Sequence, residues 1–205
     1  MTSRQVQSEE TKQKIFLATM RLLENRDADD IKITDIIKEA QVSVGSFYNH
    51  YSSKNDVFAE SYQLEDKYFE EEVEPALIQD DVRERLLFFF NRYAFYNSEI
   101  ASIGKLRYVL SCNCIHVERP YETGTLGVLQ RVIQWGINNG QLQVDENSVH
   151  MVHFMMVSAR GLIDNWYTRN KIFNLQDEMK SFVQKFIRLF CTESDSVNIT
   201  PPHTQ

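Results

Sequence analysis

Hydrophobic residues recur at every third or fourth position through most of the chain, which is the pattern of amphipathic helices. The first segment is expected to be capped by Ser8, to end near Arg26 and to bury the stripe Ile15, Phe16, Ala18, Met20, Leu22 and Leu23. The next three helices are expected to begin at Thr34, Val44 and Lys54, and the last of them runs towards Pro75. Five more are expected over Asp81–Ser98, Ile100–Ile115, Thr123–Asn139, Asp145–Asn170 and Leu175–Cys191. No segment alternates long enough to predict a strand. The pattern therefore predicts an all-α chain of about nine helices.

Two of these helices are short and lie close together. Only Gln41, Val42 and Ser43 separate the helix that ends at Ala40 from the one that begins at Val44. A helix, a three-residue turn and a second short helix form a helix-turn-helix, whose second helix enters the major groove of DNA. The spacing therefore makes DNA binding a hypothesis.

The composition restricts how DNA could be bound. The 205 residues carry a net charge of −7, 42% are hydrophobic, and 7 glycines and 4 prolines are few enough to favour long helices. A net negative charge argues against indiscriminate binding to nucleic acid, which depends on neutralising phosphates. Residues 1–56 carry 8 Lys and Arg against 9 Asp and Glu, so the acidity lies mostly beyond them. Any DNA contact must be local.

Cellular location is suggested by features that are missing from the sequence. No apolar run approaches the length of about 20 residues that spans a membrane, and the polar start lacks the apolar centre of a signal peptide. Three cysteines are an odd number and do not form a disulfide framework. We therefore expect a cytoplasmic protein without a membrane partner.

The residues around the short helices form a recognisable pattern, which consists of Thr34, Ala40-Gln41-Val42-Ser43, Gly45-Ser46-Phe47-Tyr48-Asn49-His50-Tyr51 and Ser53-Lys54. This pattern is the basis of a resemblance to the amino-terminal DNA-binding domain of TetR-family regulators. It covers about Ser8 to Phe58, and the rest of the chain is similar only in helix number, helix length and the phrases GINNGQL and RGLIDNW. Gln41 stands where the family usually has glycine, and a left-handed residue there costs about 1 kcal/mol against glycine. The turn is expected to survive this, although a rearranged turn is the alternative.

The resemblance implies two all-α domains. Residues 1–53 are expected to form a three-helix helix-turn-helix domain, and residues 54–191 a helical ligand-binding and dimerisation domain. Ser53 and Asp56 have the spacing of a helix cap, so the helix from Lys54 would join the two. The segment 192–205, with Pro201 and Pro202, is expected to be disordered.

The expected DNA-binding residues lie on or beside the second short helix, and Val42, Phe47 and Tyr51 are expected to be core. They are Thr34, Ser43, Val44, Gly45, Ser46, Tyr48, Asn49, His50 and Lys54. Thr34 would meet a phosphate, with a plain helix cap as the alternative. The resemblance turns Val44 towards bases, whereas periodicity would bury it with Phe47, Tyr48 and Tyr51. For His50 and Lys54 the alternative to phosphate contact is solvated surface.

The last two helices carry apolar stripes that suggest a four-helix interface with a second copy. The residues expected in that homodimer interface are Ala159, Ile163, Trp166, Phe182, Phe186 and Leu189. The resemblance also implies a ligand cavity in the larger domain. Its expected lining is Phe89, Tyr93, Tyr96, Tyr108, Trp135 and Phe154, although ordinary core or a partner surface is the alternative for any one of them.

No catalytic or cofactor site is legible in the sequence. Cys112, Cys114 and His116 lack the further ligands of a zinc site, so we expect no metal there, and the thiols are either buried or redox-sensing. His150 and His153 have no nucleophile at a recognisable spacing, and no phosphate or dinucleotide loop is present. We therefore expect no enzyme and no cofactor.

These observations lead to one hypothesis and two alternatives. The hypothesis is a homodimeric transcriptional regulator that binds double-stranded DNA, most simply a repressor released from a palindromic operator by a small-molecule effector. One alternative is a TetR-like activator or coactivator. The other is a helical small-molecule-binding or interaction protein that no longer binds DNA.

Overall fold

The computed structural model describes residues 3–101, 104, 122–142 and 148–191, and the described chain is helical. Its α-helices are α1 (Ser3–Leu23), α2 (Ile33–Ala40), α3 (Val44–Tyr48), α4 (Lys54–Tyr68), α5 (Val82–Phe95), α7 (Gly124–Asn138), α8 (Ser148–Thr168) and α9 (Leu175–Phe190). Short 3-10 turns cover Ala28–Asp30 and Glu74–Ala76, and π turns cover Phe69–Val73 and Tyr96–Ile100. Within the described ranges there is no strand, only an isolated bridge between Leu142 and Cys191. The all-α prediction is confirmed.

Several expectations fall outside the described residues. They are most of the helix expected over Ile100–Ile115, with Tyr108, Cys112, Cys114 and His116, and the tail 192–205.

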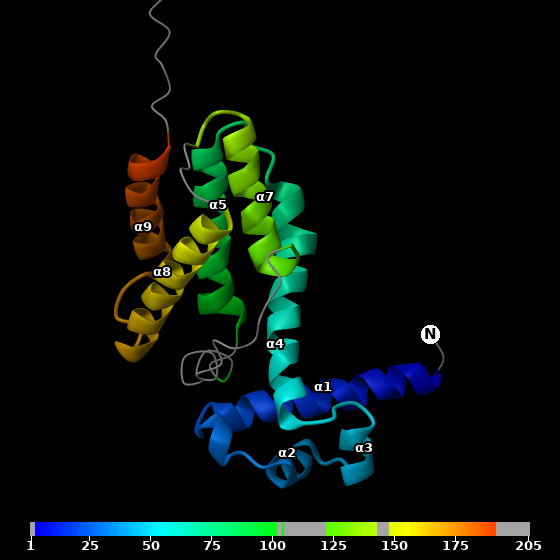
Figure 1. Cartoon of the computed structure of the whole chain (residues 1–205). Coiled ribbons are helices and arrows are strands. Elements are labelled where there is room, and N and C mark those ends of the chain that lie inside the picture. The colour runs from blue at the N-terminus through cyan, green and yellow to red at the C-terminus, as the bar shows by residue number, and fades with distance from the viewer. Residues whose placement is uncertain (1–2, 102–103, 105–121, 143–147, 192–205) are drawn as a thin grey trace, which may run out of the picture.

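The first three helices and the start of α4 enclose a small core. Figure 1 shows α1 lying across the foot of α4, with α2 and α3 on its other side. The largest buried side chains of this core are Ile15, Leu23, Ile31, Ile36, Phe47 and Phe58. We call this unit, residues 3–62, the head. Its core forms because each helix turns one apolar face inward, as expected from the sequence.

A second core fills the larger domain, where α5 packs against α9 and α7. Its first buried residue along the chain is Phe69, about two helical turns after Tyr62, the last residue of the head's core. Thus α4 contributes to both cores and links them (Figure 1). The boundary between residues 53 and 54 stays a prediction.

Two of the expected helix starts in the head differ from the structure, and a third agrees with it. α1 begins at Ser3, five residues before Ser8. The sequence did not predict this first turn because its residues are exposed and mostly polar, so they show no apolar periodicity. α2 begins at Ile33 with Lys32 at the N-cap, so the reading of Thr34 as a plain helix cap is wrong. α4 begins at Lys54 as expected, and Ser53 and Asp56 form the predicted capping box.

The first turn of α7 is capped from another helix. Its N-cap residue Thr123 makes no side-chain cap bond, and instead Glu70 accepts from the N–H of Gly124 at 2.6 Å and Asp66 from that of Thr125 at 2.8 Å. Gly124 has φ +63, and a Cβ there would lie 2.3 Å from the carboxyl carbon of Asp66. Glycine is therefore required for α4 and α7 to approach this closely.

No helix within residues 3–101, 122–142 and 148–191 combines the length and the apolar character needed to cross a bilayer.

Candidate nucleic-acid interface

The turn between α2 and α3 has a left-handed residue at position 41, where the sequence has glutamine in place of the family's usual glycine. Gln41 has φ 55 and ψ 44, and its N–H donates to the carbonyl oxygens of Ile37 and Lys38. The N–H of Val42 also donates to the Ile37 oxygen, at 3.2 Å. The turn therefore survives with a side chain in place of glycine, at a cost of about 1 kcal/mol.

α3 is a short helix with a complete amino-terminal cap. The hydroxyl oxygen of Ser43 accepts from the N–H of Ser46 at 3.0 Å and lies 2.9 Å from the hydroxyl of Ser46. A five-residue helix is too short to be stable alone, so the cap and its core contacts hold it in place. Ser43 and Ser46 thus have a structural role besides any contact with DNA.

The two sides of α3 differ sharply in exposure. Phe47 and Tyr51 are buried as expected, whereas Val44 is 58% exposed and Tyr48 is 55% exposed. The alternative that buries all four residues is therefore wrong. Gly45 and Asn49 are also exposed, and Ser46 and His50 are half-buried. The exposed side of α3 is the face that could enter a groove.

Tyr51 anchors the end of α3 against α1 and α4. Its hydroxyl donates to the carboxylate of Glu60 at 2.6 Å, and Glu60 is also 3.1 Å from the ammonium of Lys12. Burial, together with this carboxylate, raises the pKa of Tyr51 far above its usual value. The phenol therefore remains a neutral donor at physiological pH.

The remaining predicted contacts divide into exposed and internal side chains. Thr34 is exposed in the first turn of α2. Lys54 is half-buried, and its ammonium donates to the carbonyl oxygens of Ala28 at 2.8 Å, Ile31 at 3.0 Å and Asp29 at 3.4 Å. No pattern in the sequence predicts these contacts, because their partners lie on a distant segment. A phosphate contact by Lys54 stays a prediction.

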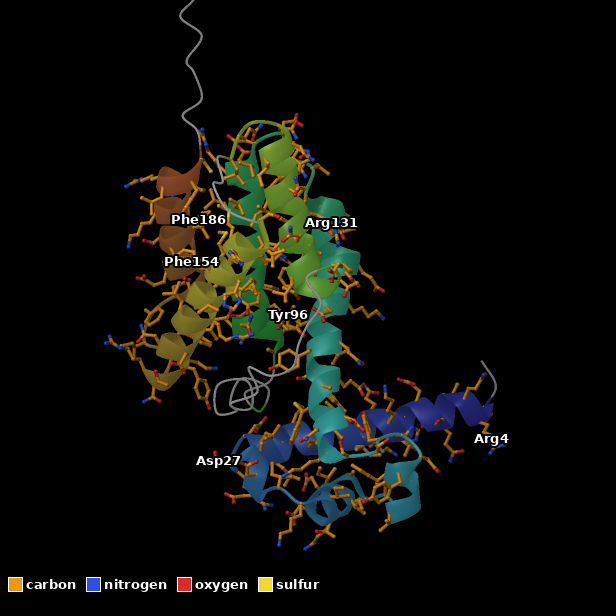
Figure 2. The ribbon with its side chains drawn as sticks, viewed as in Figure 1. Arg4, Asp27, Tyr96, Arg131, Phe154 and Phe186 are labelled. Carbon is orange, nitrogen blue, oxygen red and sulfur yellow. The ribbon has the colours of Figure 1, made fainter. Side chains whose placement is uncertain are left out.

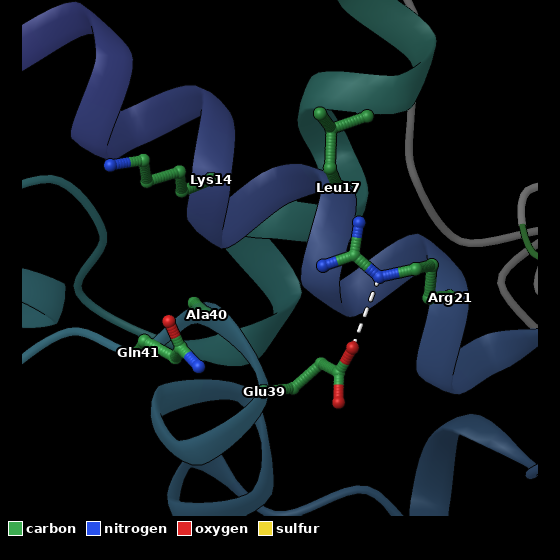
Figure 3. A pocket seen from close by; sticks show the side chains of 6 residues that line it. All are labelled: Lys14, Leu17, Arg21, Glu39, Ala40 and Gln41. Atoms are coloured by element: carbon green, nitrogen blue, oxygen red, sulfur yellow. Dashed lines mark hydrogen bonds and ion pairs between the residues drawn. The ribbon is translucent and has the colours of Figure 1, made fainter.

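A shallow groove lies on the outer side of the head, between α1 and α2. It has a volume of about 230 Å³ and is lined by Lys14, Leu17, Arg21, Glu39, Ala40 and Gln41 (Figure 3). Arg21 and Glu39 form an ion pair of 3.0 Å across it. Its lining combines opposite charges with one exposed leucine, so it has no single ligand chemistry.

The predicted ligand residues do not form one group. Phe89 and Tyr93 are buried against Phe69, and Tyr96 lies 5.0 Å from Tyr68 between ring centroids, at the lower end of α5 (Figure 2). Burial is the main cause that raises the pKa of Tyr96, helped by nearby Glu65 and Asp66.

Two other predicted ligand residues lie elsewhere. Trp135 is half-buried under the guanidinium of Arg85, 3.9 Å from its ring centroid. Phe154 is 54% exposed on α8, so it does not share an interior with Phe89 and Tyr93. The expected aromatic lining is therefore divided among three places.

Most of the predicted dimer residues are buried within this single chain. Ala159, Ile163, Trp166 and Phe186 belong to the core of the larger domain, and Phe182 is half-buried against it. Their apolar stripes pack α8 and α9 onto their own subunit. Of the six predicted residues, Leu189 alone is strongly exposed, at 78%.

The exposed apolar face of these helices lies beside the predicted stripe. It includes Phe154 and Val157 on α8 and Leu189 on α9. Phe154 contacts Phe186, which stacks on Phe190 (Figure 2). The signal in the sequence was that α8 is apolar on more than one side.

Among the residues that the structure describes, no group of three or more His, Cys, Asp or Glu is placed to hold a metal ion.

Known proteins resemble this chain in its head and in its fold. Residues 15–61 match the model of the bacterial regulatory proteins of the tetR family. That segment contains α2, the turn, α3 and most of the head's core. Among curated proteins, none matches this sequence.

Solved structures extend the likeness to the larger domain. The fatty acid degradation regulator FadR from Bacillus halodurans has a TM-score of 0.71 at 15% identity, covering 86% of this chain and 94% of that one. A protein of Syntrophomonas wolfei str. Goettingen described as a TetR-family transcriptional regulator has a TM-score of 0.67 at 19% identity, covering 88% and 94%. The MbdR regulator from Azoarcus sp. CIB has a TM-score of 0.60 at 17% identity, covering 84% and 96%. At these identities the likeness is one of fold.

The two comparisons agree with the geometry of the head. TetR-family proteins are DNA-binding regulators and not enzymes, which confirms the expectation that this chain is not an enzyme. Over residues 15–61 the chain therefore has the amino-terminal domain of the tetR family of bacterial regulatory proteins, and as a whole it has the fold of the TetR-family transcriptional regulators.

Proposed function

We propose that this protein is a homodimeric, ligand-responsive repressor that acts in the cytoplasm and binds a palindromic DNA operator through α3. The observation that carries the proposal is the division of α3 into a buried anchor, Phe47, and an exposed face with Val44 and Tyr48. A short helix held rigidly from behind presents its outer side chains at fixed positions. That is the requirement for reading base edges in a major groove.

The proposed contacts divide into base contacts and phosphate contacts. The methyl groups of Val44 suit a thymine methyl, and Asn49 has the amide that pairs with adenine. Gly45 allows the backbone to approach closely. Phosphate oxygens are proposed to be bound by Tyr48 and His50. The other DNA-facing positions proposed are Thr34, Ser43 and Ser46, and Lys54 lies at the start of α4.

A second copy of the chain is required for useful specificity. One five-residue helix offers few contacts, whereas two heads about 34–36 Å apart combine their binding energies on a palindrome. The exposed face of Phe154, Val157 and Leu189 supports an interface on α8 and α9. Large exposed apolar side chains that lie together mark surfaces that bind a partner. An isologous pairing would bury the same face on both subunits.

An effector site is proposed where α4, α5 and α7 meet. The observations that support it are the buried side chains of Tyr93, Tyr96 and Asn97, and the hydroxyl of Tyr68, which is buried without a hydrogen-bond partner among the described residues. Two π turns, at Phe69–Val73 and Tyr96–Ile100, flank these tyrosines, and π turns often mark functional sites. An apolar molecule with one hydrogen-bonding group fits this mixture.

Release of DNA would follow from a change in the separation of the two heads. Because α4 contributes to both cores, a ligand that favours another position of α4 would move the head. A ligand shifts DNA affinity only as far as it prefers one of the two arrangements. An activator could use the same coupling between ligand and DNA. That the protein represses transcription is therefore a separate part of the proposal.

A gel-shift scan tests the DNA-binding proposal. The full chain is mixed with duplex fragments from beside its own gene at several salt concentrations. Saturable, salt-sensitive binding to one palindromic fragment is expected. Indifference to every fragment would favour a helical small-molecule-binding or interaction protein that has lost DNA binding. Compounds that raise the melting temperature are then tested for release of the bound fragment, which tests whether the ligand site and the DNA site are coupled.

A further inference from the structure

The link between α1 and α2 is held by two cationic side chains. Four successive carbonyl oxygens of this link, those of residues 28–31, each accept a hydrogen bond from an ammonium or guanidinium group. Lys54 donates to Ala28, Asp29 and Ile31, and Arg26 donates to Asp30. The guanidinium of Arg26 also bonds the carboxylate of Asp35 at 3.0 Å. The link is therefore fixed by charge-assisted contacts on both sides.

The chemistry of Lys54 suits these partners. An ammonium is a compact charge with three donor hydrogens, so it can satisfy three converging carbonyl oxygens at once. Those oxygens lie in the 3-10 turn Ala28–Asp30 and at Ile31, the residue after it, where carbonyl groups commonly lack a helical partner; the Ala28 oxygen also accepts from the N–H of Ile31 at 3.3 Å. The site is half-buried, which strengthens these bonds relative to bonds in water.

The position of Lys54 gives these contacts a consequence for α2. Lys54 is the first residue of α4, and its partner Ile31 is fully buried two residues before α2 begins. Fixing Ile31 fixes the path of the chain into Ile33 and Thr34. Thr34 is the DNA-facing position proposed in this first turn, where backbone N–H groups that lack an intrahelical partner also suit a phosphate.

We propose that Lys54 is a positioning residue for DNA binding. Its ammonium holds the link so that the first turn of α2 presents Thr34 and its backbone N–H groups to a phosphate, and the ammonium itself does not contact DNA. This inference rests on the proposed function. It assigns the Lys54 side chain to hydrogen bonds within the head, in place of the direct phosphate contact expected from the sequence.

Hydrogen exchange tests the structural half of the inference. In the full chain, Lys54→Met is expected to speed exchange about tenfold at the amides of Ile31, Asp35 and Ile36, which donate to carbonyl oxygens in or beside the link. Lys38→Met is the matched control, because it removes an exposed lysine from the same domain. The control is expected to leave these three amides unchanged. Unchanged exchange in Lys54→Met would overturn the inference.

Salt dependence tests the functional half. The probe is the strongest duplex that the unmodified chain selects from a random library of about 30 base pairs. Lys54→Met is expected to weaken binding about tenfold while leaving the slope of log affinity against log salt unchanged. A direct phosphate contact would instead lower the slope by about 0.9 when it is removed. A slope that falls by this amount would overturn the inference.

Lys54→Arg provides a second comparison. Arginine would keep a phosphate contact, whereas its planar guanidinium cannot converge on three carbonyl oxygens as an ammonium does. We therefore expect Lys54→Arg to bind DNA more weakly than the unmodified chain, and full affinity in this variant would contradict us. If the unmodified chain selects no duplex, the proposed function itself fails, which is a different result from either of these.

Discussion

The head and the larger domain differ in how directly their surfaces reveal a function. In the head, α3 has one buried side and one exposed side, and the exposed side carries the residues that the sequence motif assigns to DNA. In the larger domain, α8 and α9 are apolar on several sides, and the most regular stripe is used inside the subunit. A regular apolar stripe therefore shows that a helix is covered, but not which chain covers it.

The largest expected effect concerns the anchor of α3. Phe47 is fully buried, so Phe47→Ala should lower the free energy of unfolding of the head by about 3–5 kcal/mol. Val44→Ala removes methyl groups from the exposed side of the same helix and should change stability by less than about 0.5 kcal/mol. Chemical denaturation followed by circular dichroism measures both. Equal losses would show that α3 has no distinct inner and outer side.

The next effect concerns the exposed face of α8. If this face pairs with its copy, Phe154→Glu places a carboxylate in an apolar interface on each subunit and should weaken dimerisation about a hundredfold. Analytical ultracentrifugation measures the change. Ile78→Glu, at another strongly exposed apolar position, between α4 and α5, is the control and should leave the dimer intact. A Phe154→Glu dimer of unchanged affinity would exclude this face as the interface.

The same experiment separates Phe154 from Phe186. Phe186 is buried in the core of its own subunit, so a polar substitution there should lower the stability of the larger domain itself. Loss of the dimer in that variant would not by itself identify an interface. Phe154 is the sharper position because its side chain is exposed within one subunit.

Local features of the head were predictable because their partners are close in the sequence. The capping box of Ser53 and Asp56 spans three residues, and the left-handed conformation of Gln41 follows from its place after a helix end. The burial of Phe47 follows from the same short motif. Such contacts depend on spacing along one helix or turn, which the sequence contains directly.

Contacts between distant segments could not be predicted in this way. Lys54 bonds carbonyl oxygens 23–26 residues earlier, and Asp66 and Glu70 cap a helix 54–59 residues later. These partners are defined only once the helices have packed. Phe154 and Ile163 lie on the same helix, yet Phe154 is on the surface and Ile163 is in the core of the larger domain. The positions of these residues along the chain did not predict this difference.

The cap of α7 offers a smaller effect that tests one of these long-range contacts. Asp66→Ala removes the acceptor of the Thr125 N–H and should lower the free energy of unfolding of the larger domain by about 1 kcal/mol. Asp177→Ala removes an exposed acid from the first turn of α9, where Asn174 already provides the cap, and should cost about 0.3 kcal/mol. Thermal unfolding compares the two. Similar losses would mean that α7 does not depend on the cap from α4.

The smallest effect is a gain in stability at the turn of the head. Gln41 holds a left-handed backbone at φ 55, which costs a residue with a side chain about 1 kcal/mol against glycine, so Gln41→Gly should raise the free energy of unfolding by about 0.5–1 kcal/mol. Lys171 in the larger domain is left-handed as well, at φ 59, but its ammonium lies 4.9 Å from the ring centroid of Trp166. Lys171→Gly loses this cation–π contact and should gain less. The difference between the melting temperatures of the two variants measures the cost of having a side chain at the left-handed position 41. A loss of stability in Gln41→Gly would show instead that the glutamine side chain stabilises the turn.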